Sequence, residues 1–137
     1  MDMQITFPGG KRVDAQYKGF DIKTDQPVRN GGDGSEPAPF DLFLASLGTC
    51  AGIFVLSFCQ ERKIPTDNIR IIMRTEKSPE KTMIEKITIE IILPKEFPER
   101  YLGAVRQSAN LCSVKKHMQQ SPDFEITTTY STDGSKK

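Results

Sequence analysis

Apolar and polar residues alternate along the first part of the chain in a way that predicts β-strands. The alternation is clearest over residues 12–24, and a shorter strand-like piece spans residues 4–7. Gly9-Gly10 and Lys18-Gly19 have the composition of turns. We therefore expect the chain to begin with short strands joined by tight turns.

A long apolar stretch follows and predicts a central helix, roughly Phe40 to Lys63. Residues 42–59 carry no charge, and the Gly- and Pro-rich segment 29–39 before them reads as a loop. Eighteen uncharged residues are the lower limit for a membrane span. Serine, threonine and glycine dilute the stretch, however, and charged residues close it at both ends. We expect the buried centre of a soluble domain and no membrane segment.

The second half of the chain returns to alternation and then to helical spacing. Residues 69–91 predict a β-hairpin with its turn at residues 77–81, and residues 97–111 predict a second helix whose apolar face continues to Cys112. Residues 124–130 alternate again and predict a last strand before a polar tail. This segregation of strands and helices predicts an α+β fold, with a single domain over residues 1–137.

Composition and charge limit the classes of binding partner and the cellular compartment that we expect for this protein. The 137 residues include 19 Lys and Arg against 18 Asp and Glu, so the net charge of +1 provides no field to capture nucleic acid. The three cysteines are odd in number and widely spaced, which favours reduced thiols. No signal-like segment opens the sequence. We expect a cytoplasmic protein that does not bind nucleic acid.

The cysteines are the strongest candidates for chemistry, although a single cysteine is most often a small buried core residue. Cys50 lies between two glycines, each costing about 1 kcal/mol inside a helix. They suggest close backbone approach, a helix break or access to the sulfur, and tight packing against a strand or helix would explain them equally. Cys59 is about half a turn out of phase and ~13 Å along the axis, so it belongs to the core. Cys112 ends the second helix, and its pairing with Cys50 is the one that this topology favours.

Other cofactor chemistry finds little support in the sequence. Cys112 and His117 lie five residues apart, but the short paired spacings of zinc sites are missing. The glycines near residue 31 are not followed by the Lys-Ser or Lys-Thr pair of a phosphate-binding loop. We expect no metal and no cofactor.

Two segments together resemble a known family. Residues 31–50, GGDGSEPAPFDLFLASLGTC, and residues 111–114, LCSV, resemble the OsmC and Ohr family of organic hydroperoxide reductases, in its more divergent OsmC-like branch. The resemblance extends over nearly the whole chain in the order of elements. It implies an OsmC-like fold in which strands wrap around a buried central helix and two chains intertwine as a homodimer, with each active site at the interface.

The resemblance also implies roles for the two cysteines. Cys50 matches the peroxidatic cysteine, whose thiolate attacks a hydroperoxide and becomes a sulfenic acid, and Cys112 matches the resolving cysteine, which condenses with it to a disulfide. An external dithiol, often a lipoylated protein in the family, then reduces that disulfide. Such proteins act in antioxidant stress responses.

A cation must lower the pKa of the attacking thiol, because burial alone would raise it. The family uses an arginine from the N-terminal strands, held by an acidic side chain at the start of the central helix. Arg12 is the expected equivalent here, with Lys11 and Arg29 as alternatives.

The acidic partner departs from the Ohr pattern. Ohr-type members have glutamate ten residues before the cysteine, where this chain has Phe40, whereas Asp41 stands nine before, as in the OsmC-like branch. On a straight helix Asp41 would point away from Cys50. Either the helix breaks, for example at Gly48, or Asp41 serves only as a charge at the helix start.

Two functional hypotheses follow. The first is a thiol-dependent peroxidase that reduces organic hydroperoxides, and conceivably hydrogen peroxide, in an apolar pocket. The second is a non-catalytic OsmC-like dimer that binds a small hydrophobic or thiol ligand, or acts as a redox sensor. A third interpretation assigns the cysteines to packing alone. Candidate pocket residues are four apolar side chains, which plain core packing would also explain: Phe43, Leu47, Phe54 and Tyr101.

Overall fold

The computed structural model describes residues 2–80 and 82–131 and begins with a three-stranded antiparallel sheet. Its strands are β1 (Gln4–Gly9), β2 (Arg12–Tyr17) and β3 (Phe20–Thr24), in the order β1-β2-β3. Lys18 and Gly19 turn between β2 and β3 with φ of 53° and 82°, the left-handed conformation of two-residue hairpin turns. The expected N-terminal strands and both of their turns are confirmed.

The loop between β3 and the central helix is organised around one buried carboxylate. Asp25 is 1% exposed. It accepts hydrogen bonds from the hydroxyl of Ser35 at 2.7 Å and from the backbone N–H groups of Gln26, Asp33 and Ser35 at 2.7, 3.3 and 3.0 Å. The Ser35 hydroxyl and then these amides lower the pKa of Asp25 to about 2. The carboxylate thus ties the short helix η1 (Val28–Asn30) and the glycine-rich segment to the end of β3.

Asp25 is expected to make the fold acid-sensitive. A carboxyl group with a lowered pKa stabilises the fold fully above its unfolded value near 3.8, and this contribution is lost as the pH falls from about 4 to about 2. Asp25→Asn should lower the melting temperature at pH 7 by several degrees and flatten its dependence on pH over that window. Circular dichroism melts from pH 2 to pH 7 measure both, with Asp33→Asn in the same loop as the control. Equal pH slopes for wild type and Asp25→Asn would contradict the assignment.

The central helix α1 (Pro39–Glu61) is continuous. The backbone N–H of Ala38 donates to the carboxylate of Asp41 at 3.1 Å, so Asp41 closes the first turn. The helix does not break at Gly48. A Cβ at Gly48 would lie 4.0 Å from Met73 and one at Gly52 would lie 3.8 Å from Ile71, so both glycines face the following strand. An added methyl group at either position would make ordinary van der Waals contacts, so packing against the strand does not by itself require glycine there.

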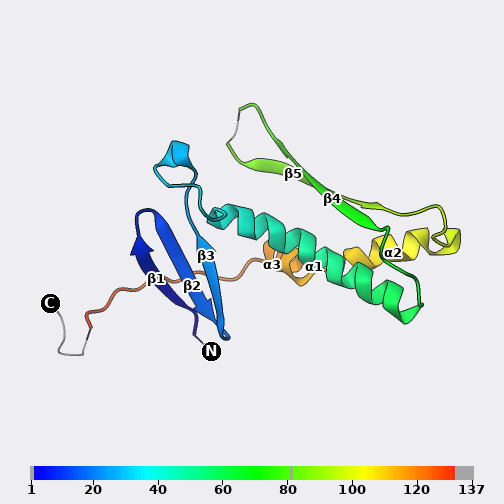
Figure 1. Cartoon of the computed structure of the whole chain (residues 1–137), viewed down its shortest axis with the longest axis horizontal. Helices are drawn as coiled ribbons and strands as arrows, with labels where there is room; N and C mark the ends of the chain where they lie inside the picture. The colour runs from blue at the N-terminus through cyan, green and yellow to red at the C-terminus, as the bar shows by residue number, and fades with distance from the viewer. Residues whose placement is uncertain (1, 81, 132–137) are drawn as a thin grey trace.

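The second half of the chain packs a hairpin and two short helices on α1 (Figure 1). Strands β4 (Arg70–Lys77) and β5 (Ile84–Ile92) pair antiparallel as predicted, with residue 81 of their connection outside the described residues. The expected second helix is shorter than predicted. A turn of 3-10 helix η2 (Glu99–Tyr101) leads into α2 (Leu102–Ala109), and a further helix, α3 (Ser113–Gln119), follows directly after Cys112.

The core lies between the C-terminal half of α1, the hairpin and α2. Its buried members are Val55, Phe58, Cys59, Phe97 and Val105. Cys59 is 0% exposed, and burial raises the pKa of its thiol. The expectation that Cys59 is a core residue is confirmed.

The predicted last strand is wrong for the single chain. Residues 121–131 have no regular secondary structure and extend away from the helices (Figure 1). Phe124, Ile126 and Tyr130 are 85%, 94% and 96% exposed. Alternation specifies a strand only where another strand supplies hydrogen-bond partners and a surface for the apolar face. The polar tail, 132–137, lies outside the described residues.

The folded chain leaves much apolar surface uncovered. Its accessible surface is 11113 Å², whereas a compact monomer of 15.4 kDa has roughly 7200 Å². Among the described residues, α1 is long and apolar enough to cross a membrane by length and composition, and only 28% of its most apolar window is buried. The core helix of a soluble protein has the same composition. Most of the apolar surface of α1 is therefore exposed in the single chain.

Candidate thiol site

The structure brings Cys50 and Cys112 together. Cys50 lies in the middle of α1, and Cys112 is the N-cap residue of α3. The two thiols are close enough that each influences the pKa of the other, and the Ser113 hydroxyl oxygen lies 3.8 Å from the Cys50 sulfur. All three cysteines are free, so this is the dithiol form.

The two thiols are electrostatically unequal. The backbone N–H of Val114 is the largest influence on Cys50 and lowers the pKa of its thiol. Burial opposes this effect, and bonds from Cys112 and Ser113 add to it. The pKa of Cys112 is raised, first by burial and then by the neighbouring Cys50, although the N–H of Lys115 bonds its sulfur at 3.4 Å. These opposite directions favour the thiolate at Cys50 and the protonated thiol at Cys112.

This inequality comes from the local fold around residues 110–115. After α2 ends, the chain turns and starts again as α3, so the first amides of α3 point toward Cys50. The sequence prediction continues the apolar face of α2 to Cys112 and therefore misses the contribution of Ser113 and Val114. Asn110 and Ser113 were the available signal, because these residue types favour helix ends over helix interiors.

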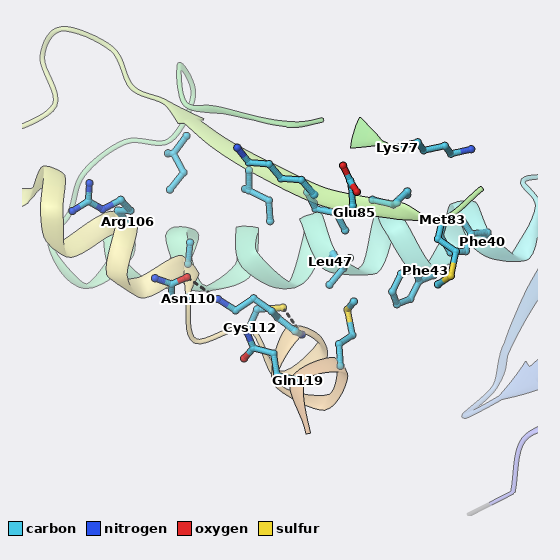
Figure 2. A pocket seen from close by; sticks show the side chains of 18 of the residues that line it. Phe40, Phe43, Leu47, Lys77, Met83, Glu85, Arg106, Asn110, Cys112 and Gln119 are labelled. Atoms are coloured by element: carbon cyan, nitrogen blue, oxygen red, sulfur yellow. Dashed lines mark hydrogen bonds between the residues drawn. The ribbon is translucent and has the colours of Figure 1, made fainter. Parts of the chain in front are cut away.

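A cavity of about 820 Å³ lies beside Cys112, between α1, the hairpin and the two short helices. Figure 2 shows Phe43 and Leu47 on α1 and Cys112 near the start of α3 facing this space. Isoleucines of β5 form much of the wall, and basic side chains stand at α2, α3 and the end of β4. The lining residues that carry this description are Phe40, Phe43, Leu47, Lys77, Met83, Ile87, Ile89, Ile91, Arg106, Cys112, Lys115 and Met118.

The four predicted pocket residues separate into two groups. Phe43 and Leu47 line the cavity, whereas Phe54 and Tyr101 are not among its lining residues. The Tyr101 ring instead packs edge-on against Phe58, with ring centroids 5.7 Å apart. The cavity residues of β5 and α3 were missed because their faces depend on how the hairpin and α3 dock on α1.

The predicted activating residues do not reach Cys50 within one chain. Arg12 lies on β2 with Nη2 3.6 Å from an oxygen of Asp14. Arg12 Nε and Asp14 Oδ1 are buried without a hydrogen-bond partner among the described residues. The described groups that shift the pKa of Cys50 are amides, a hydroxyl and a thiol, with no cation among them.

Asp41 accepts a hydrogen bond from the backbone N–H of Ala38 in the first turn of α1, so it acts as a charge at the helix start, the second of its two predicted roles.

The thiol pair is not part of a metal-binding cluster among the described residues. No group of three or more His, Cys, Asp and Glu is placed to hold a metal ion within residues 2–80 and 82–131. The ring Nδ1 of His117 bonds instead to the carbonyl oxygen of Ser113 at 2.7 Å.

Fold and site together define an α+β protein with a thiol pair held between a central helix and the start of a short helix. The family model described as OsmC-like protein matches residues 32–127, so the chain belongs to the OsmC-like family. Members of this family, which includes hydroperoxide resistance proteins, are generally homodimers. No curated protein matches the chain significantly.

Solved structures support the same fold. A Psychrobacter arcticus protein named for osmotic stress and detoxification has a TM-score of 0.69 and 22% identity over 83% of this chain and 85% of its own. An OsmC-like protein of Mycoplasma pneumoniae has a TM-score of 0.67 and 13% identity over 88% and 87%. The organic hydroperoxide resistance protein OsmC of Legionella pneumophila has a TM-score of 0.53 and 15% identity over 86% and 88%.

Proposed function

We propose that this chain is a thiol-dependent peroxidase that reduces organic hydroperoxides, with Cys50 as the attacking thiolate and Cys112 as the resolving thiol. The observation that carries the proposal is the juxtaposition of the two thiols, each of which influences the pKa of the other and whose pKa values shift in opposite directions. An attacking thiol must be ionised and a resolving thiol must lie within reach of it. Membership in a family that includes hydroperoxide resistance proteins supports the same chemistry.

The reaction would proceed in three balanced steps. The Cys50 thiolate attacks the terminal oxygen of ROOH, the O–O bond breaks, and the leaving alkoxide takes a proton to become an alcohol. Cys112 then attacks the sulfur of the Cys50 sulfenic acid, forming the disulfide and releasing water. An external dithiol finally restores both thiols by two exchanges and leaves as its own disulfide.

The cavity beside the thiol pair would receive the organic part of the substrate. Its aromatic and isoleucine walls favour an apolar group, and burial of each CH₂ contributes about 0.8 kcal/mol. Hydrogen peroxide gains nothing from these walls. We therefore expect bulky organic hydroperoxides to be better substrates than hydrogen peroxide.

The direct test is consumption of cumene hydroperoxide by the reduced protein in the presence of a dithiol. One disulfide between Cys50 and Cys112 should form per equivalent of peroxide when no dithiol is added, as read by peptide mass mapping. If neither cumene hydroperoxide nor hydrogen peroxide is consumed and no such disulfide forms, the proposal fails.

We propose that the missing cation is Arg12 of a second copy in a homodimer. Three features of the single chain favour a homodimer: its large accessible surface, the exposed apolar surface of α1 and the exposed alternating segment 124–130. A second copy of the chain has the same exposed elements, which would cover one another at a two-fold interface. Arg12 has an unsatisfied Nε and a carboxylate neighbour, Asp14, that can orient it. A guanidinium reaching Cys50 across the interface would further favour its thiolate.

A mixed dimer tests whether Arg12 acts across the interface. Arg12→Ala and Cys50→Ser should each be nearly inactive, and their co-expressed, tag-selected mixed dimer should recover about half of the wild-type rate, because one of its two sites then has both residues. The same pairing with Lys11→Ala in place of Arg12→Ala is the control for the rival cation. An inactive mixed dimer would place Arg12 in the same chain as the cysteine it serves, whereas an active Arg12→Ala homodimer would place Arg12 outside the site.

One observation favours a second candidate function. Cys50 is not among the residues that line the cavity, although Cys112 is. The cavity could therefore hold a small hydrophobic or thiol ligand against Cys112 without turnover, as a binding or redox-sensing module. Native mass spectrometry that finds a retained ligand, together with no disulfide on peroxide titration, would favour this function over the peroxidase.

A further inference from the structure

Ser113 is an exposed residue at the start of α3, directly after Cys112. Its hydroxyl oxygen lies 3.8 Å from the sulfur of Cys50. We propose that Ser113 is a catalytic residue, whose hydroxyl donates a hydrogen bond to the Cys50 thiolate and keeps that sulfur facing Cys112. The catalytic part of this assignment rests on the proposed function, whereas the hydrogen bond itself does not.

The direction of the hydrogen bond follows from the charge on Cys50. In the dithiol form either the sulfur or the hydroxyl could donate. Once Cys50 is a thiolate it has no proton left, so the hydroxyl must donate. Hydrogen bonds to an ionised group are about twice as strong as neutral ones, so the contact gains strength in the state that attacks the substrate.

Ser113 is the one donor around Cys50 whose removal leaves the rest of the arrangement in place. The other donors to its sulfur are the N–H groups of Val114 and Ser113 and the thiol of Cys112. A side-chain change cannot remove the amides, and changing Cys112 would remove the resolving thiol. A Ser113 substitution therefore isolates one hydrogen bond to the thiolate.

A purely structural role for the hydroxyl is poorly supported. In the first turn of α3 the capping contact is made by Cys112, whose sulfur accepts from the N–H of Lys115. Because Ser113 is exposed and is not the N-cap residue, Ser113→Ala should fold normally. Its effect should then be confined to the sulfur that the hydroxyl contacts.

The test is the rate of iodoacetamide alkylation at each cysteine from pH 5.5 to pH 10, resolved by peptide mass spectrometry. In Ser113→Ala the midpoint for Cys50 should move to higher pH, and below the midpoint the rate should fall by at least roughly tenfold, as expected for a lost hydrogen bond to a charged group. Ser113→Thr, which keeps the hydroxyl, should stay close to wild type. Ser108→Ala on α2, whose hydroxyl bonds the Val105 carbonyl oxygen, is the matched control.

Buried Cys59 provides an internal standard and should react equally slowly in every variant. A Cys50 profile in Ser113→Ala that superimposes on the wild-type profile would overturn the assignment, and so would an equal shift in Ser113→Thr. The assay involves no peroxide. A shifted profile in a protein that consumes no peroxide would leave the hydrogen bond standing while the peroxidase proposal fails.

Discussion

Cys50→Ser is expected to abolish peroxide consumption, lowering kcat/KM for cumene hydroperoxide by at least roughly a thousandfold. The reason is that the proposed reaction has one nucleophile, and a serine hydroxyl is not ionised at neutral pH under the amides that favour the thiolate of Cys50. Peroxide loss with a dithiol present measures the rate. Substantial activity in Cys50→Ser would exclude Cys50 as the attacking residue.

Cys112→Ser provides the matched comparison, because it removes resolution and leaves the attack intact. With no dithiol added, it should consume about one equivalent of peroxide and keep a sulfenic acid on Cys50 that dimedone traps, whereas the wild type forms the Cys50–Cys112 disulfide instead. Cys59→Ala should turn over like wild type, since Cys59 lies in the core and away from the pair. A stalled Cys59→Ala, or a Cys112→Ser protein in which dimedone traps no sulfenic acid on Cys50, would contradict the assigned roles.

Gly32→Ala is expected to be the most destabilising of the single glycine substitutions. A Cβ at Gly32 would lie 2.0 Å from the carbonyl oxygen of Gln26 and 2.8 Å from the carboxylate of Asp25. These atoms belong to the backbone and to the carboxylate that holds the loop, so neither can move without breaking the hydrogen bonds of Asp25. We expect a loss of roughly 2 to 4 kcal/mol in the free energy of unfolding.

Gly103→Ala is the control for this substitution. Apart from its chain neighbours and the backbone of its own helix, no atom of the described residues lies within 4 Å of its Cβ position. Because the residue belongs to α2, alanine should stabilise the protein by up to about 1 kcal/mol. Urea unfolding at one fixed protein concentration measures both variants, because the stability of a dimer depends on concentration. Equal stability of Gly32→Ala and wild type would mean that the loop can rearrange around the added methyl group.

Much of the fold was predictable because its elements are specified locally. The alternation in residues 12–24 and 69–91 and the turn residues between strands lead directly to β2, β3 and the β4–β5 hairpin. The prediction of α1 from the uncharged segment succeeds for the same reason. A long apolar segment between a Pro-rich loop and a charged end has few other stable forms. The α+β class follows from the order of these elements.

The prediction failed where the outcome depends on a neighbour. Residues 124–130 have the pattern of a strand but pair with no strand within residues 2–80 and 82–131, and α3 starts where helical spacing predicted only the end of a helix. Phe54 and Tyr101 have the same apolar character as Phe43 and Leu47. Only the docking of the hairpin and the short helices decides which of these side chains borders the cavity.

For the thiol pair as well, the sequence and the tertiary structure determined different properties. The sequence determined which cysteines are candidates, because Cys59 is out of helical phase with Cys50 and Cys112 lies on an element that must pack on α1. The tertiary structure decided that the two thiols differ. Backbone amides at the start of α3 lower the pKa of Cys50, whereas burial raises the pKa of Cys112. These amides lie more than sixty residues after Cys50 in the chain, so packing and not local sequence determines their direction.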